Sequence, residues 1–228
     1  MADDQIRITL AEAKHKDGIL NLLREAFVPR SPMWAVLGIT WDEVKDRFER
    51  MVDNSVVDPV SVVAIDQSTP DHKVIGCGLC KVIDLTKSTN EDGDFFESPE
   101  NNKVRAIAHV HNQLMRGWKD ELKREGAEKV LEFVILCVDD SYGGRGVAQS
   151  LVDRTLELAR DAAVDSVFSL AANWRSVRVF KKLQFESRRT LEYAKVVDPT
   201  TGLPFVVPED GSTAIAWVVN KLNGISGA

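Results

Sequence analysis

A strand that leads through a glycine-rich loop into an amphipathic helix is the feature that most restricts how this chain can fold. The apolar run 131–138 predicts a buried strand, and 143–148 then reads Gly-Gly-Arg-Gly-Val-Ala. Apolar residues recur at helical spacing from there to Ala162. Glycines let backbone N–H groups approach an anion, and a helix N-terminus attracts negative charge. The segment therefore predicts a phosphate-binding turn, while a tight strand-to-helix connection without a ligand would explain the glycines equally well.

The remaining chain alternates between strand and helix patterns. Helical spacing predicts helices over 20–27, over 41–52 with Thr40 as N-cap, over 104–124, and from Asn173 to about Leu183. β-Branched and apolar runs predict further strands, at 6–10, 60–65, 74–83, 166–171, 185–197 and 213–222. An early hairpin, a central strand-loop-helix-strand unit and a final antiparallel pair together predict an α/β sandwich around one partly parallel sheet.

Length and composition favour a single globular domain over residues 1–228. The chain has 228 residues, of which 44% are apolar and 28% charged, enough to bury one sizeable core. The acidic stretch 84–101 reads as a solvated loop that is too short to link two domains. The longest apolar run, 133–138, is too short to cross a bilayer, so we expect neither secretion nor membrane attachment.

Charge and cysteine usage restrict the partners. The net charge of −6 argues against a nucleic-acid surface and is compatible with a cationic substrate. Three cysteines, Cys77, Cys80 and Cys137, lie in strand-like runs and predict reduced thiols in a cytoplasmic protein. Cys77 and Cys80 have the spacing of half a zinc site without a second pair, and His109 and His111 point to different sides of a helix. We therefore expect no metal.

The glycine loop resembles the signature of the GNAT superfamily of N-acetyltransferases, Arg/Gln-x-x-Gly-x-Gly/Ala between the fourth strand and the third helix. Gly146 and Ala148 match it, whereas Gly143 stands at the opening Arg or Gln, with Arg145 as a partial substitute. The likeness covers roughly residues 6–222, the expected core, and is greatest to the arylalkylamine N-acetyltransferase-like branch of invertebrates. The strings that carry it are 135–139, 145–148, Ser176, 180–185, 198–204 and 214–222.

This resemblance implies a fold and a cosubstrate. The fold is α/β, with a mixed central sheet of about seven strands that splay apart between strands 4 and 5 and with helices on both faces. The cosubstrate is acetyl-coenzyme A (acetyl-CoA), and no metal is involved. The implied cofactor contacts are the backbone of Leu136, Cys137 and Val138, the loop residues Gly143, Gly144, Arg145, Gly146, Val147 and Ala148, and Asn173, Phe180 and Lys182.

The resemblance also implies direct attack of an amine on the thioester, which requires a general base because most of a primary amine is protonated at neutral pH. The branch places a Glu-Pro pair where this chain has Ser31-Pro32, and serine cannot act as that base unaided. Glu132, eleven residues before Gly143, is the best replacement. Apolar neighbours would raise the pKa of its carboxyl, unless Glu132 simply faces solvent.

Two further positions bear on catalysis and three on the substrate. Many GNAT members use a tyrosine at the position of Phe180 to reprotonate the thiolate, and Ser176 matches a serine of the branch that bears on catalysis. Alternatively, the Ser176 hydroxyl bonds the start of its helix. Ser31, Pro32 and Trp34 lie in the expected substrate-side loop, where the tryptophan either walls the pocket or belongs to the core.

The sequence thus predicts an acetyl-CoA-dependent N-acetyltransferase that acts on a small primary amine, either an arylalkylamine or a polyamine-like compound. A protein or peptide N-acetyltransferase and a non-catalytic acyl-CoA-binding domain are the alternatives. We expect a monomer or a weak homodimer.

Overall fold

A computed structural model describes residues 5–87, 101–197, 202 and 208–222. Its seven strands form one sheet in the order β1-β2-β3-β4-β5-β7-β6, in which β4 and β5 are parallel and all other neighbours are antiparallel. The mixed sheet expected from the sequence is confirmed. The strands are β1 (Ile6–Leu10), β2 (Val62–Asp66), β3 (Val74–Asp84), β4 (Lys129–Val138), β5 (Ser166–Ala171), β6 (Glu186–Glu192) and β7 (Ala214–Lys221).

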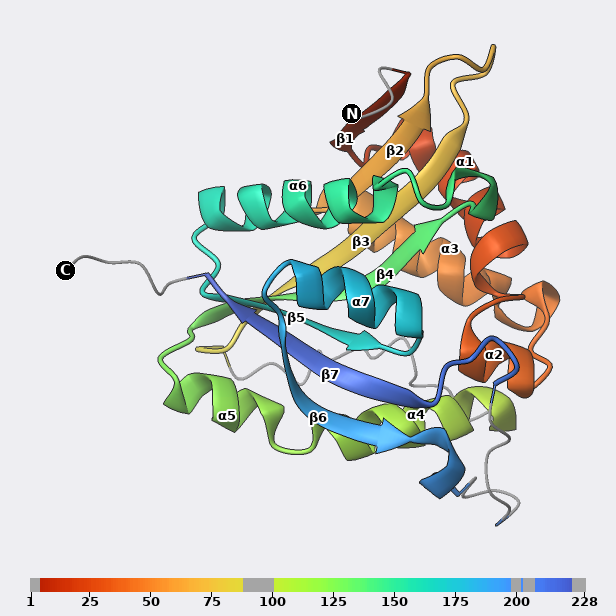
Figure 1. The fold of residues 1–228 in the computed structure, drawn as a ribbon. Coiled ribbons are helices and arrows are strands. Elements are labelled where there is room, and N and C mark those ends of the chain that lie inside the picture. The colour runs from red at the N-terminus through yellow and green to blue at the C-terminus, as the bar shows by residue number, and fades with distance from the viewer. Residues whose placement is uncertain (1–4, 88–100, 198–201, 203–207, 223–228) are drawn as a thin grey trace.

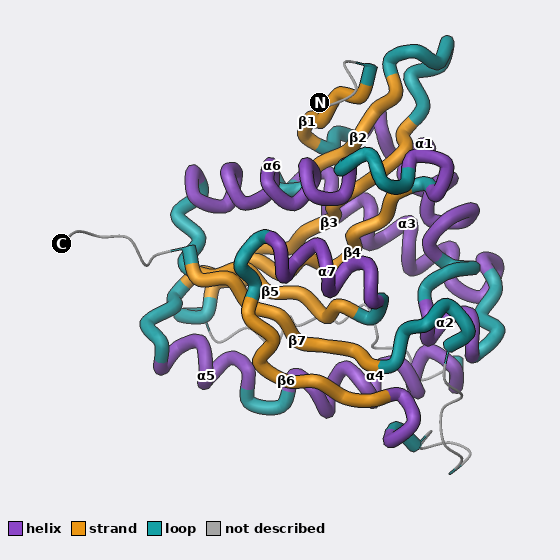
Figure 2. The backbone as a smooth tube through the Cα atoms, viewed as in Figure 1, coloured by secondary structure: helices purple, strands orange, loops and turns teal. Residues whose placement is uncertain are grey.

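Helices cover both faces of this sheet (Figures 1 and 2). One face packs against α6 (Val147–Asp161) and α7 (Trp174–Lys182). The opposite face packs against α1 (Lys16–Leu22), its π-helical continuation η2 (Leu23–Phe27), α2 (Pro32–Val36), α3 (Trp41–Val57), α4 (Asn102–Met115) and α5 (Trp118–Arg124). Three short 3-10 turns complete the described elements, η1 (Ala13–His15), η3 (Asp140–Tyr142) and η4 (Tyr193–Lys195).

The structure corrects two predicted elements. The single helix expected over 104–124 is wrong, because the chain leaves the helical conformation at Arg116 and Gly117 adopts a left-handed φ of +70°, which separates α4 from α5. The strand expected over 185–197 ends at Glu192, and η4 follows it from Tyr193. The turn expected at 198–204 and residues 88–100 of the acidic loop lie outside the described residues, apart from Gly202.

β4 and β5 separate partway along their length. Their register runs from Val130 opposite Ser166 to Phe133 opposite Ser169. The buried Ser169 hydroxyl donates to the Phe133 carbonyl at 2.9 Å, at the last paired position of these two strands. β5 continues to Ala171 paired only with β7, and β4 continues to Val138 paired only with β3. The splay expected from the sequence is therefore present.

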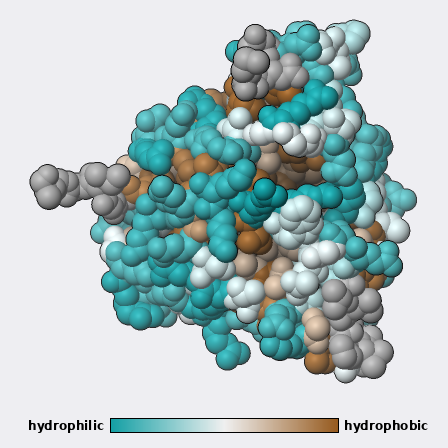
Figure 3. All heavy atoms as spheres, in the orientation of Figure 1, coloured by the Kyte–Doolittle hydropathy of each residue, from teal (hydrophilic) through white to brown (hydrophobic). Residues whose placement is uncertain are grey.

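The surface seen in Figure 3 is mainly polar, and the described helices are those of a globular domain. Figure 3 shows mainly polar residues on the face seen in Figure 1, with apolar residues in patches between them. Within the described ranges, no helix has the length and apolar character needed to cross a bilayer. Nor do three or more metal-ligating side chains come together in this part of the chain.

Candidate active site

The second half of β4 presents an open backbone edge. The Asp139 N–H donates to the Ile75 carbonyl on β3, and Cys137 lies opposite Cys77. Because peptide groups alternate in direction along a strand, those of Cys137 pair with β3, whereas those of Leu136 and Val138 point to the side from which β5 has departed. Of the three residues expected to bind cofactor through their backbone, Leu136 and Val138 therefore face the opening, where the Val138 carbonyl accepts a hydrogen bond from Arg30 at 3.3 Å.

The environment of the Cys137 thiol disfavours reaction as a nucleophile. It lies in the core with 6% of its surface exposed, and burial raises its pKa to about 12. A protonated thiol is a poor nucleophile, so the side chain has the character of a small apolar residue. The direct attack that the family resemblance implies needs no such nucleophile.

The glycine loop turns the chain from β4 into α6. Gly144 and Gly146 have φ values of +76° and +82°, a left-handed conformation that side chains other than glycine rarely adopt. The first α6 hydrogen bond joins the Ser150 N–H to the Gly146 carbonyl at 3.0 Å. The N–H groups of Val147 and Ala148 consequently lack helical partners and point out of the helix start. This arrangement suits an anion such as a diphosphate.

Two side chains anchor the start of this loop to the β2–β3 hairpin. The Asp139 carboxylate forms an ion pair with Lys73 at 2.8 Å and accepts the Ser141 amide and hydroxyl at 3.0 and 2.7 Å. Tyr142 donates its hydroxyl to Asp66 at 2.6 Å. Burial alone would raise the pKa of Asp139, but Lys73 and Ser141 outweigh it and lower that pKa to about 2.

Replacing Asp139 by alanine is expected to lower the free energy of unfolding by about 1 kcal/mol at pH 7, since the turn loses its cap. The carboxyl has a lower pKa in the folded state than its usual 3.8, so its stabilisation is present above about pH 4 and fades as the pH falls toward 2. Urea unfolding at pH 7 and pH 3 measures this, with Asp71→Ala in the exposed hairpin as control. A difference from wild type that is equal at both pH values contradicts the assignment.

Glu132 lies on β4 next to the point of separation. It is half-buried and pairs with Lys81 on β3 and Phe168 on β5, one residue before the last β4–β5 pair. Its neighbour Val130, two residues earlier and on the same face, packs in the cluster with Trp118 of α5, so Glu132 faces the α4–α5 side. The position is thus neither fully solvent-facing nor sealed in the core.

Ser176 and Phe180, which both lie on α7, have different surroundings. The Ser176 hydroxyl donates to the Asn173 carbonyl at 2.8 Å, the bond to its own helix start that the sequence left open as an alternative. Phe180 is 1% exposed, with its ring edge-to-face against Phe133 at 5.7 Å. It thus belongs to the core on the α6–α7 side of the sheet, where it packs against Phe133.

The remaining cofactor positions lie at the two ends of α7. The Asn173 side chain caps the helix by accepting the Arg175 amide at 2.7 Å and donates to Asp210 at 3.0 Å. Lys182, at the other end of the helix, is exposed. Of these two residues, only Asn173 lies at the N-terminus of α7. Arg175, in the same turn, reaches Asp140 at the start of the glycine loop.

The expected substrate-side residues fold into an aromatic cluster. Ser31 is the N-cap of α2 and Pro32 is buried at its first position. Trp34 is 4% exposed and packs against Phe27 and Phe48, with ring centroids 6.0 and 5.3 Å away. The tryptophan thus belongs to the core in this structure, as the sequence allowed, and its role as a pocket wall remains a prediction.

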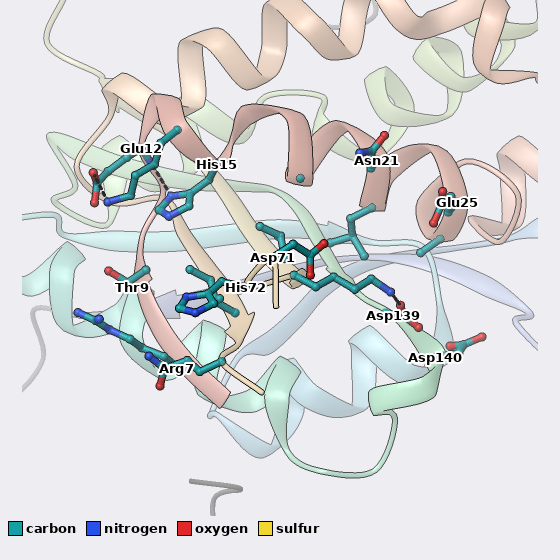
Figure 4. A pocket seen from close by; sticks show the side chains of 18 of the residues that line it. Arg7, Thr9, Glu12, His15, Asn21, Glu25, Asp71, His72, Asp139 and Asp140 are labelled. Atoms are coloured by element: carbon teal, nitrogen blue, oxygen red, sulfur yellow. Dashed lines mark hydrogen bonds and ion pairs between the residues drawn. The ribbon is translucent and has the colours of Figure 1, made fainter. Parts of the chain in front are cut away.

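A large cleft lies beside this site. It has a volume of about 990 Å³ between α1 and the β2–β3 hairpin, and its lining side chains converge from both (Figure 4). One end reaches Arg30, Asp139 and Asp140, but neither Glu132 nor the loop glycines line it. The expected base and the expected phosphate-binding glycines therefore lie outside this cleft.

Sequence reasoning missed three charged residues at the mouth of the site. Arg30 follows η2, Asp140 begins η3, and Arg175 lies in the first turn of α7, yet the Asp140 carboxylate forms ion pairs with both arginines. Along the chain, Arg175 lies 35 positions and Arg30 lies 110 positions from Asp140. No local motif links them, so only the folded arrangement reveals the cluster.

Solved structures of other acetyltransferases have the same fold. Arylalkylamine N-acetyltransferase 2 from Aedes aegypti matches with a TM-score of 0.81 and 20% identity over 96% of this chain and 100% of that chain. Polyamine N-acetyltransferase from Drosophila melanogaster, described as catalysing the formation of N-acetylagmatine, matches with a TM-score of 0.76 and 16% identity over 95% and 99%. NAA60 from Arabidopsis thaliana in complex with acetyl-CoA gives 0.57 and 16% over 96% and 99%.

The family model described as acetyltransferase (GNAT) family matches residues 23–185. This segment runs from η2 through the splayed strands, the glycine loop and α6 to the end of α7. It contains the open β4 edge and every expected cofactor position. The chain therefore belongs to the GNAT family of acetyltransferases.

Proposed function

We propose that this protein transfers the acetyl group of acetyl-CoA to a small primary amine, either an arylalkylamine or a polyamine-like compound. The observation that carries the proposal is the open β4 edge of Leu136 and Val138, which leads directly into the unpartnered amides at the start of α6. An extended pantetheine arm carries amide groups that pair with such an edge, and a diphosphate fits the helix start.

The residues present fit the cosubstrate at both positions. The backbone groups of Leu136 and the amide of Val138 would bind the pantetheine, and the amides of Val147 and Ala148 would bind the diphosphate. An N–H group of the β4 edge would also stabilise the negative charge that develops on the thioester oxygen. Binding both reactants in one opening supplies much of the rate through orientation.

We assign the general base to Glu132. A primary alkylamine with a pKa of about 10.4 is unprotonated in only about one molecule in 2,500 at pH 7, so a group that removes its proton is needed. Ser31 and Phe180 cannot serve as base and acid, and the Ser176 hydroxyl already donates to Asn173. Glu132 is the carboxylate next to the point where β4 and β5 separate, which supports this role.

The proposed substrate class rests on the net charge of the chain and on its similarity to solved structures. The chain carries a net charge of −6, which attracts a cationic amine. Structures with the same fold include enzymes described as acting on arylalkylamines and on agmatine. The three cysteines of the chain are free and buried, which supports a reducing compartment such as the cytoplasm.

Free-thiol release from acetyl-CoA tests the proposal. The purified chain is mixed with acetyl-CoA and a panel of arylalkylamines, diamines, agmatine and peptides. We expect thiol release with one or more small amines and none with peptides. Release with peptides alone would identify a protein acetyltransferase, and CoA binding without release from any acceptor would identify a non-catalytic binding domain.

A further inference from the structure

The glycine loop lacks a side-chain anchor for a diphosphate at its opening position. Gly143 has no side chain, and its amide is already used, donating to the Asp140 carbonyl at 2.9 Å. The Arg145 guanidinium lies over the Tyr142 ring, 5.1 Å from its centroid, and donates to the Ser141 carbonyl at 3.5 Å. In this structure Arg145 is thus engaged within the loop itself, and a further cation for the diphosphate would come from another segment of the fold.

The Asp140 carboxylate forms ion pairs with two such cations at the start of the loop. Arg30 reaches its carboxylate from the segment between η2 and α2, and Arg175 reaches the other oxygen from the first turn of α7 at 3.7 Å. The Asp140 side chain is 63% exposed. A lone exposed carboxylate beside a diphosphate would repel it, whereas two guanidinium groups reverse the local charge.

The two arginines are fixed to different degrees. Arg30 donates its Nε to the Ala26 carbonyl at 2.7 Å and an Nη to the Val138 carbonyl at 3.3 Å, and its side chain is 33% exposed. Arg175 has a 59% exposed side chain and a longer ion pair. Exposed ion pairs of this length contribute little to stability, so Arg175 can exchange its partner at small cost.

We propose that Arg175 is the side chain that binds the diphosphate of CoA in this protein, in place of the missing anchor at Gly143. Arg30 stays on Asp140 and on the β4 edge, where it neutralises the carboxylate. Arg175 turns from Asp140 to the diphosphate when CoA binds, with its planar group suited to paired phosphate oxygens. This inference rests on the proposed use of CoA.

Calorimetric titration of CoA into Arg175→Gln tests the proposal. We expect about tenfold weaker binding than in wild type, the lower range for a charge-assisted hydrogen bond at an exposed site. Arg175→Lys should recover part of the affinity. The control is Arg160→Gln, which removes the same charge from the exposed last turn of α6, about 20 Å along the helix from its start, and should bind as wild type does.

Asp140→Asn separates a ligand role from a structural one. If Arg175 binds CoA, this variant binds at least as tightly as wild type, because it removes a negative charge and releases the arginine. If the Arg175–Asp140 pair serves only to hold α7 against the loop, both variants weaken binding alike, and the proposal is overturned. Unchanged affinity of Arg175→Gln also overturns it, whereas absence of any CoA binding by wild type refutes the proposed function itself.

Discussion

Replacing Glu132 by glutamine is expected to lower kcat for amine acetylation by about 10²–10⁴-fold at pH 7, the range for loss of a general base. The substitution keeps the size and hydrogen-bonding capacity of the side chain and removes its ability to take a proton. Glu132 lies on β4 before the open edge, so the cosubstrate contacts of Leu136 and Val138 are not touched. The affinity for CoA should therefore match that of wild type.

The pH dependence provides the sharper test of this role. As the pH rises from 7 to 9, the unprotonated fraction of an amine with a pKa of about 10.4 grows about a hundredfold, so less depends on an enzymatic base. The deficit of Glu132→Gln relative to wild type should accordingly shrink toward high pH. A lost structural contact would instead produce a deficit that is independent of pH.

The matched control is Glu128→Gln, which alters an exposed glutamate just before β4. It should leave kcat and its pH profile unchanged. Equal rates for Glu132→Gln and wild type across pH 6 to 9, a window around the reference pKa values of histidine and cysteine, would remove Glu132 from the mechanism. Urea unfolding of each variant shows whether any loss of activity comes from loss of folded protein.

Elements with strong periodicity could be predicted from the sequence. The apolar run before the glycine loop corresponds to β4, and the helical spacing after it corresponds to α6, which begins at Val147. Both signals are local, since burial on one face fixes the spacing of apolar residues. The break between α4 and α5 was missed because Arg116 and Gly117 interrupt a pattern that apolar residues continue on both sides.

Contacts between segments distant in sequence leave no comparable local pattern of residues. The hydrogen bond from Arg30 to the Val138 carbonyl joins residues 108 positions apart, and the Asp140 ion pairs depend on where η2 ends and α7 begins in space. The core position of Trp34 depends likewise on Phe27 and Phe48 packing around it. The sequence could therefore locate the cofactor loop but not the charges that surround it.

Truncating Phe133 to alanine is expected to lower the free energy of unfolding by about 3–5 kcal/mol, which is a large part of the 5–15 kcal/mol that typically stabilises a domain. Phe133 is 1% exposed, and its ring fills the space above Gly78, where an added Cβ would approach the ring to 2.8 Å. The same ring meets Phe180 edge-to-face. Alanine would leave a cavity that these rigid neighbours cannot close.

The location of Phe133 adds a functional consequence to this loss. Its carbonyl accepts the Ser169 hydroxyl at the last tie between β4 and β5, so a collapse of the ring pocket would alter the point from which the strands diverge. Phe133→Ala should therefore also weaken CoA binding. Phe133→Leu, which retains most of the volume, should cost about 1.5 kcal/mol or less and leave CoA binding near wild type. Urea unfolding measures both variants, and a loss below about 1 kcal/mol for alanine would mean that the core relaxes around the missing ring.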